Sequence, residues 1–312
     1  MSGPETTPIL SAEHARVAVD DVIAIEDLSL TTRGDRVLLV GDVTVLFAAL
    51  SGVPLLAVTP DPSTNEAGLA GEARFVGGAA RLDGLDVIDG AHLAIAGFAP
   101  LDPPVPRNMT ALAYVEWAAR LAAVKPRAAR EMAAFAMKRV GLLASVGRVA
   151  ATLGLAERRA LQLAKAIVND PRVLVAEAPL DRLEGAGAAF VTGALAAATE
   201  GRRTLLSARA IEPGTAEGAL ARGASQLVFL GDAGVVAEGA PASFTSGARV
   251  YRLTVATNPD ALKASLAARG LTLSAGPVHF TIALPEGTTT APVVEAASEA
   301  RAAVVEMVPI AR

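Results

Sequence analysis

The sequence predicts an α/β fold that ends in a small α+β module. Apolar and polar residues alternate over residues 21–39, which is typical of β-strands. A basic helix at residues 157–168 is followed by a short buried strand at residues 173–176. After residue 250 the patterns run in the order βαββαβ. Together these observations indicate a sheet core with helices, followed by a compact module.

Composition excludes several classes of function. The chain has 312 residues, enough for one large domain with an appendage or for two domains. Its formal net charge of −4 argues against a nucleic-acid-binding protein, which normally has a basic face. The absence of cysteine excludes disulfides and thiolate metal sites, and three scattered histidines do not suggest a metal cluster. We therefore expect neither a nucleic-acid partner nor a metal site.

The beginning of the chain predicts a cytoplasmic location. Residues 1–14 lack the positive flank and apolar core of a signal peptide. The uncharged run at residues 43–59 has the composition of a membrane span, but a spanning helix needs about 20 residues. Gly52 and Pro54 also interrupt the run. We therefore expect a buried helix followed by an extended segment.

The first third of the chain is predicted to consist of strands around one short helix. A β-hairpin over residues 21–39, turning at Gly34 and Asp35, should lead into a buried strand. A tight turn at residues 41–44 should then start the short helix. Glycine turns between short strands follow at residues 71–88.

The middle of the chain is predicted to be helical. The proline-rich loop at residues 103–107 should be rigid, because each proline fixes its own φ and restricts the preceding residue. Two helices are expected within residues 111–143. For Tyr114, Trp117 and Phe135 on these helices, ordinary core packing is favoured over the alternative of a ligand-stacking set.

Residues 153–184 show the most specific pattern. A turn is followed by a basic helix that ends at Asn169-Asp170-Pro171. A buried strand, an acidic residue and a proline come next. This order resembles the segment of ABC (ATP-binding cassette) ATPases that runs from LSGGQRR through a helix and four apolar residues to DEP. Residues 25–41 resemble the family's first strands, and residues 95–103 resemble its entry into the Q-loop. The resemblance implies a P-loop NTPase-like ABC cassette with a mixed sheet core, an antiparallel β arm and an α-helical subdomain.

In that family a Walker A loop, GxxxxGK[ST], holds the phosphates of ATP. Its backbone N–H groups and lysine contact phosphate, and its hydroxyl holds magnesium. This chain has only Gly41, Asp42, Val43 and Thr44 before the helix, so about four residues of the loop are missing. Thr44 falls at the hydroxyl position, Val43 falls at the lysine position, and Asp42 adds negative charge where phosphate would lie. A tight turn without phosphate is favoured over a shortened loop that still binds ATP.

Other nucleotide-binding positions of the family are also replaced. No aromatic residue precedes Phe47, so the family's platform for adenine is absent. Leu101 occupies the position of the Q-loop glutamine. Gly154 and Leu155 stand where the signature has serine and glycine, and Glu177 takes the place of the aspartate that orders magnesium.

The remaining site positions complete this vestigial set. Ala178 occupies the position of the catalytic glutamate, so general-base catalysis, which accelerates a reaction roughly 10²–10⁴-fold, is absent. Arg209 stands for the switch histidine, where a surface ion pair is favoured over stabilisation of phosphate charge. Arg158, Arg159 and Lys165 are expected on a solvated face. The vestigial positions are Gly41, Asp42, Thr44, Leu101, Gly154, Glu177, Ala178 and Arg209.

Two domains are predicted. Residues 1–246 should form the degenerate ABC ATPase-like domain, with its helical subdomain at about residues 103–155 and a closing hairpin at residues 225–238. Residues 247–312 should form a βαββαβ domain similar to the C-terminal accessory domain of ABC exporter ATPases. Its strands are expected at 251–255, 271–274, 278–284 and 304–310, and its helices at 260–268 and 292–301.

These losses predict a pseudo-ATPase that needs no cofactor. In the family each ATP lies between the Walker motifs of one subunit and the signature of the other. In a heterodimer with a normal ATPase, this chain would therefore leave one ATP site without intact Walker motifs and the other without an intact signature. We predict a subunit that docks on a membrane permease, on a true ATPase partner or on both, in a hetero-oligomer peripheral to the inner face of the cytoplasmic membrane. One alternative is a divergent ATPase that uses Thr44, Glu177 and Arg209 with ATP and magnesium. Another is a soluble scaffold outside any transporter.

Overall fold

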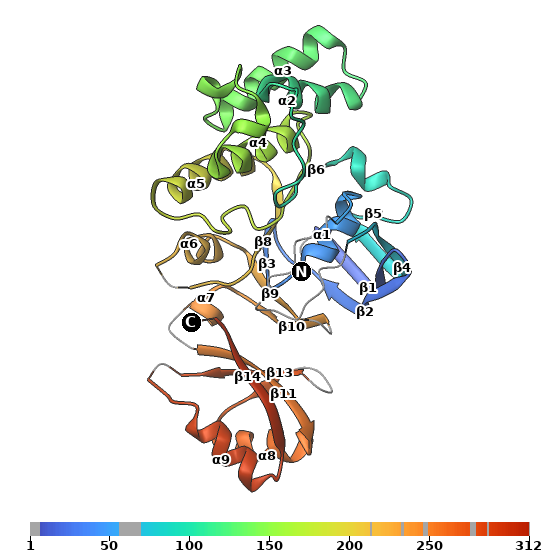
Figure 1. The fold of residues 1–312 in the computed structure, drawn as a ribbon. Helices are drawn as coiled ribbons and strands as arrows, with labels where there is room; N and C mark the ends of the chain where they lie inside the picture. Colours follow the sequence, from blue (N-terminus) through green and yellow to red (C-terminus); the bar gives the residue numbers. More distant parts are fainter. Residues whose placement is uncertain are drawn as a thin grey trace, which may run out of the picture.

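A computed structural model describes residues 7–55, 70–212, 214–231, 234–245, 249–274, 279–285 and 287–311. Within these ranges the strands form three sheets (Figure 1). The first sheet forms the β arm, the second is the central sheet and the third consists of strands from the C-terminal part of the chain. None of the described helices combines the length and apolar character needed to cross a bilayer.

The central sheet has the strand order β10-β9-β3-β8-β7-β6. β10 is antiparallel to β9, and the other neighbouring pairs are parallel. The apolar strands are buried on both faces, as parallel strands covered on two sides should be. Val173 and Val175 belong to the apolar cluster on one face, whereas Leu174 and Ala176 belong to the cluster on the other. The strands are β3 (Arg36–Val40), β6 (Ala96–Ala99), β7 (Val173–Ala176), β8 (Arg203–Ala208), β9 (Gln226–Gly231) and β10 (Gly234–Gly239).

The β arm corrects one prediction. Its strands are antiparallel in the order β2-β1-β4-β5, and α1 packs between the arm and the central sheet. The hairpin predicted over residues 21–39 is wrong, because β2 pairs with β1 and β3 belongs to the central sheet. The chain reverses instead at Asp20 and Asp21, where Asp20 takes a positive φ of 50°. The elements are β1 (Leu10–Val19), β2 (Val22–Thr31), α1 (Thr44–Ser51), β4 (Ala73–Leu82), β5 (Leu85–Asp86) and the 3₁₀ helix η1 (Ala91–Ala94).

The helical part covers one face of the central sheet. α4 and α5 pack on the sheet, and α2 and α3 pack on α4 (Figure 1). Tyr114 is buried, but Trp117 is 46% exposed and Phe135 is 66% exposed, so core packing is wrong for these two residues. Both project from the helix faces opposite the buried alanines and valines. The elements are α2 (Ala111–Leu121), α3 (Pro126–Arg139), η2 (Leu143–Ser145), η3 (Ala150–Thr152), α4 (Leu155–Ile167), α5 (Gly185–Thr199), α6 (Ala216–Arg222) and α7 (Ala242–Thr245).

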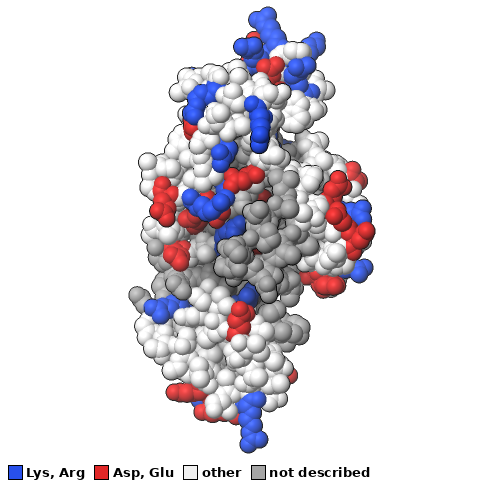
Figure 2. Space-filling model, in the orientation of Figure 1, with Lys and Arg blue, Asp and Glu red and all other residues white. Residues whose placement is uncertain are grey.

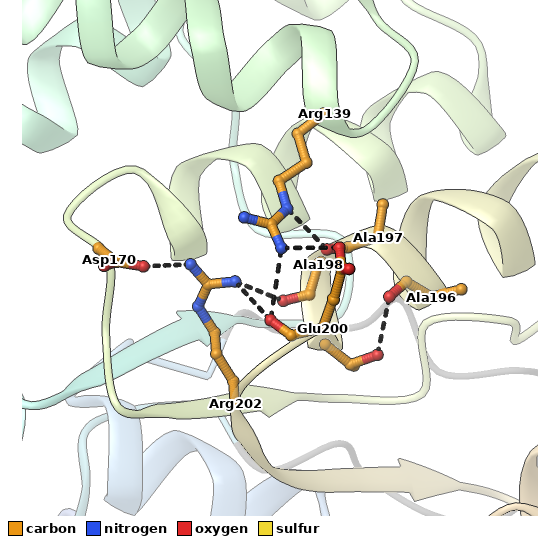
Figure 3. Close-up of polar contacts among 8 residues, drawn as sticks. Arg139, Asp170, Ala196, Ala197, Ala198, Glu200 and Arg202 are labelled. Carbon is orange, nitrogen blue, oxygen red and sulfur yellow. Dashed lines mark hydrogen bonds and ion pairs between the residues drawn. The ribbon is translucent and has the colours of Figure 1, made fainter.

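Two arginines tie the helical part to the central sheet at the end of α5 (Figure 3). Arg139 of α3 donates hydrogen bonds to the carbonyls of Ala197, at 2.8 Å, and Glu200, at 3.3 Å. Arg202, just before β8, donates to the carbonyl of Ala198 and pairs with Asp170. The last carbonyls of a helix lack partners within it, and cations there also interact favourably with the helix dipole. These contacts therefore fix α3 relative to the core.

The elements from residue 249 onward show the predicted βαββαβ order. Their sheet has the order β12-β13-β11-β14, and their apolar core includes Leu253 and Ile282 from the sheet and Leu262 and Val293 from the helices. Three predicted features lie partly outside the described residues: the strand start at residue 278, the middle of the closing hairpin at residues 232–233 and the end of the extended segment at residues 56–59. The elements are β11 (Arg249–Thr257), α8 (Pro259–Ala268), β12 (Leu273–Ser274), β13 (His279–Leu284), α9 (Ala291–Glu299) and β14 (Ala303–Ala311).

Candidate functional site

Four segments of the candidate site follow neighbouring strands of the central sheet. Residues 41–44 follow β3, Leu101 follows β6, Glu177 follows β7 and Arg209 follows β8. Because these strands are parallel, their carboxyl ends lie at one edge of the sheet, which is the usual ligand position in open α/β sheets. The fold therefore brings these sequence-predicted positions to one edge.

The turn from β3 into α1 is short and is closed by the chain itself. Gly41 has a φ of +124°, and a Cβ there would lie 2.3 Å from the carbonyl oxygen of Leu230, so the turn requires glycine. The N–H of Thr44, the first residue of α1, donates a hydrogen bond of 3.1 Å to Oδ1 of Asp42. Free N–H groups at a helix N-terminus are the groups that bind phosphate. Here one of them is bound to a carboxylate of the same chain.

Glu177 is a buried carboxyl group in contact with this edge. Its side chain accepts a hydrogen bond of 2.9 Å from the N–H of Leu101, and the residue is 6% exposed. Burial raises the pKa of Glu177, with a further contribution from the charge of Asp42, while the Leu101 N–H and the Thr44 hydroxyl oppose the increase. The neutral form of the carboxyl is therefore more favoured than in an exposed glutamate. Leu101 contributes its backbone to this contact.

Ala178 follows in a constrained turn. Its φ is +36°, and its N–H donates a hydrogen bond of 2.9 Å to the hydroxyl of Ser207. Positive φ is uncommon for a residue other than glycine, and it costs free energy that the surrounding structure must offset. The methyl group of Ala178 has no atom that can accept a proton from water.

A network of ion pairs that the sequence interpretation did not identify lies beside Glu177. Asp102 pairs with Nη1 of Arg159 at 3.3 Å and with Nη2 of Arg182 at 2.6 Å. Arg182 also pairs with Asp181, and Asp181 lies 3.5 Å from Nε of the exposed Arg209. The network joins the loop after β6 to α4 and to the segments after β7 and β8. Its cations are thus already paired with carboxylates of the chain.

The solvated face predicted for the basic residues of α4 is wrong for Arg159, which is buried, whereas Arg158 and Lys165 are partly exposed. Arg159 is 3% exposed, and burial lowers its pKa while Asp102 opposes that decrease. Burial alone lowers the pKa of Lys165 to about 8. Arg159 lies on a helix that is buried on several sides, which explains why its side chain does not face solvent.

The start of α4 is also capped from within the chain. The N–H of Gly154 donates a hydrogen bond of 3.0 Å to Oε2 of Glu157. The other oxygen of Glu157 accepts hydrogen bonds from the Ser145 hydroxyl, at 2.7 Å, and from Arg148, at 2.5 Å. These bonds lower the pKa of Glu157 although its partial burial acts in the opposite direction. The Glu157 carboxylate therefore fixes the segment that is predicted to replace the family signature.

The side chains at this edge do not fit the Walker A set for a magnesium nucleotide. Val43, at the position predicted for the phosphate-binding lysine, carries no charge. The Asp42 carboxylate accepts a hydrogen bond from an N–H of α1, and burial raises the pKa of Glu177. Among the described residues, no group of three or more acidic or histidine side chains is arranged to hold a metal ion.

Comparison with known proteins shows the fold. No model of a protein family matches the sequence, and no curated protein matches it. Solved structures do match. One, described as the ATP-binding subunit of an ABC transporter, has a TM-score of 0.55 and 14% identity, and the match covers 76% of this chain and 92% of that one. Another, an ATP-binding cassette of an ABC transporter, has a TM-score of 0.58 and 16% identity, with 77% and 96% covered. The predicted α/β cassette fold is therefore confirmed, and at these identities the likeness concerns the fold alone.

Proposed function

We propose that the chain is a catalytically inactive ABC-type subunit, a pseudo-ATPase, which assembles with a membrane permease, an ATPase partner or both. It would act as a structural or regulatory component at the inner face of the cytoplasmic membrane. The observation that carries this proposal is the hydrogen bond between the Asp42 carboxylate and the first N–H of α1, within a cassette fold.

Electrostatics supports the absence of catalysis. A phosphate at the N-terminus of α1 would lie near the Asp42 carboxylate and would be repelled by its charge. Val43 offers no compensating cation, and Arg159 and Arg182 are already paired with Asp102. The site therefore opposes nucleotide binding, in addition to lacking a general base.

The helical part offers a surface for a protein partner. Phe135 on α3 is 66% exposed and Leu143 in η2 is 58% exposed. In the ABC family, which the sequence resembles, the membrane subunit normally docks on the α-helical subdomain, so we assign the partner contact to Phe135 and its surroundings.

The test is co-purification of the tagged chain from membranes of its own cells, with the recovered proteins identified by mass spectrometry. We expect a protein with transmembrane helices to be recovered, with or without an ATPase. Phe135→Asp should abolish this recovery, while the control Val294→Asp, at a 63% exposed position on α9, should retain it. Recovery of soluble proteins alone would support the scaffold alternative instead.

The divergent-ATPase alternative has one observation in its favour. The Thr44 hydroxyl opposes the rise in the pKa of Glu177, so the two groups that would hold magnesium in this alternative influence each other. ATP hydrolysis that requires both side chains would support this alternative over the pseudo-ATPase.

A further inference from the structure

We propose that the end of the α2–α3 hairpin binds the surface of membranes that contain anionic phospholipids. We call this region the helical tip, residues 117–131. It comprises the last turn of α2, the connection and the first turns of α3. The inference does not rest on the proposed function, since a chain that hydrolysed ATP would carry the same tip.

Charge is distributed unevenly along the chain. Residues 103–155 contain eight Lys and Arg but only two Glu, a formal charge of +6 in a chain of −4, so the rest of the chain carries −10. Figure 2 shows Lys and Arg gathered at the end of the molecule formed by α2 and α3. The exposed cations of the tip are Arg120, Lys125, Arg127 and Arg130. This end of the molecule therefore attracts an anionic surface.

These cations are free to act on a partner. Arg127 pairs with Glu131 at 3.2 Å, but the two side chains are 93% and 68% exposed. Such a pair contributes little, because water screens both charges. Within the described residues, the side chains of Arg120, Lys125 and Arg130 make no ion pair. Each cation near an anionic membrane surface is expected to strengthen binding about fivefold.

Apolar side chains accompany the cations. Trp117 is 46% exposed and Leu121 is 68% exposed, and the spacing of Trp117, Arg120 and Leu121 places all three on one face of α2. The Trp117 ring stacks on Tyr114 with centroids 6.2 Å apart and planes at 18°, so its orientation is set before contact. Tryptophan favours the headgroup region of a bilayer, and leucine favours the acyl boundary.

A lipid surface fits this arrangement better than a nucleic acid. A flat membrane meets only the tip, whereas a long polyanion that extended along the molecule would meet the negative charge of the rest. The exposed aliphatic Leu121 also gains from acyl chains but has no comparable use against phosphates.

The test uses the fluorescence of Trp117, the only tryptophan of the chain. The full chain is titrated with vesicles of phosphatidylcholine alone and of phosphatidylcholine mixed with phosphatidylglycerol. We expect a blue shift and co-sedimentation with the mixed vesicles only, weakened by salt. The double variant Arg120→Gln and Lys125→Gln should lower the affinity roughly 25-fold. The control Arg222→Gln with Lys263→Gln removes the same charges at exposed positions elsewhere and should bind like the unmodified chain.

Three results would overturn the proposal. They are equal binding to phosphatidylcholine alone, no binding to the mixed vesicles, and binding that the tip variant does not weaken. A tip that bound an oligonucleotide while ignoring both kinds of vesicle would reassign the surface to nucleic acid. Circular dichroism of each variant verifies that the fold is retained.

Discussion

Replacing Asp102 by asparagine tests whether the ion-pair network holds the helical part on the core. Arg159 is 3% exposed, and the Asp102 side chain is 31% exposed. The variant leaves a buried guanidinium without its nearest counter-charge, and removing one partner of a buried pair costs about 3–5 kcal/mol. Because Asp102 is partly hydrated, we expect the lower end of that range, about 3 kcal/mol of unfolding free energy.

Urea unfolding followed by the fluorescence of Trp117 is a suitable assay, since this residue lies on α2 and reports on the helical part. The double variant Asp102→Asn with Arg159→Met should be more stable than Asp102→Asn alone, because it removes the unpaired charge. Glu131→Gln is the matched control. It breaks the exposed pair with Arg127 and should cost about 0.5 kcal/mol or less.

The reasoning would be refuted if Asp102→Asn cost no more than this control. Additive effects of the Asp102 and Arg159 substitutions would also contradict it, because residues that interact directly must show coupling.

Three further predictions follow from the same geometry. Glu177→Gln should raise the unfolding free energy at neutral pH, and the gain should vanish as the pH falls to 4.5. Burial raises the folded-state pKa of Glu177, so ionisation of this carboxyl destabilises the fold only at pH values above its pKa in the unfolded chain. A gain in unfolding free energy that did not change with pH in urea titrations would contradict this. Gly41→Ala should cost about 3 kcal/mol of unfolding free energy, because φ is positive there and the added Cβ would clash with Leu230. The control Gly52→Ala should cost about 1 kcal/mol, because a Cβ there meets open space. Similar losses of stability for the two variants in thermal unfolding would contradict the clash. Arg139→Gln should cost about 1–2 kcal/mol of unfolding free energy in urea, because two carbonyls at the end of α5 lose their charged donor. An unchanged urea midpoint would show that these hydrogen bonds do not stabilise the fold.

Local pattern was sufficient for elements whose burial follows a regular period. The bounds of β7 are predicted to the residue, because β7 is an apolar run with polar neighbours. The pairing of β2 was predicted wrongly, because its partner β1 shows no clear alternation around the irregular register at His14.

The candidate site was predicted in position but not in its contacts. The order of motifs placed Leu101 and Glu177 at the ends of strands, and the structure brings them into hydrogen-bond contact. The pairing of Asp102 with Arg159 and Arg182 joins residues 57 and 80 positions apart. The only signal in the sequence was an acidic residue in a loop and basic residues elsewhere, and a single sequence does not specify which of them meet.

The central claim is that the chain itself occupies the position where a cassette binds nucleotide. Isothermal titration calorimetry of the purified chain with ATP and magnesium, combined with phosphate release, tests it most directly. We expect no binding heat and no hydrolysis, because Asp42 holds the α1 N-terminus and Glu177 is buried. Magnesium-dependent binding and turnover that are both lost in Thr44→Ala would contradict the claim.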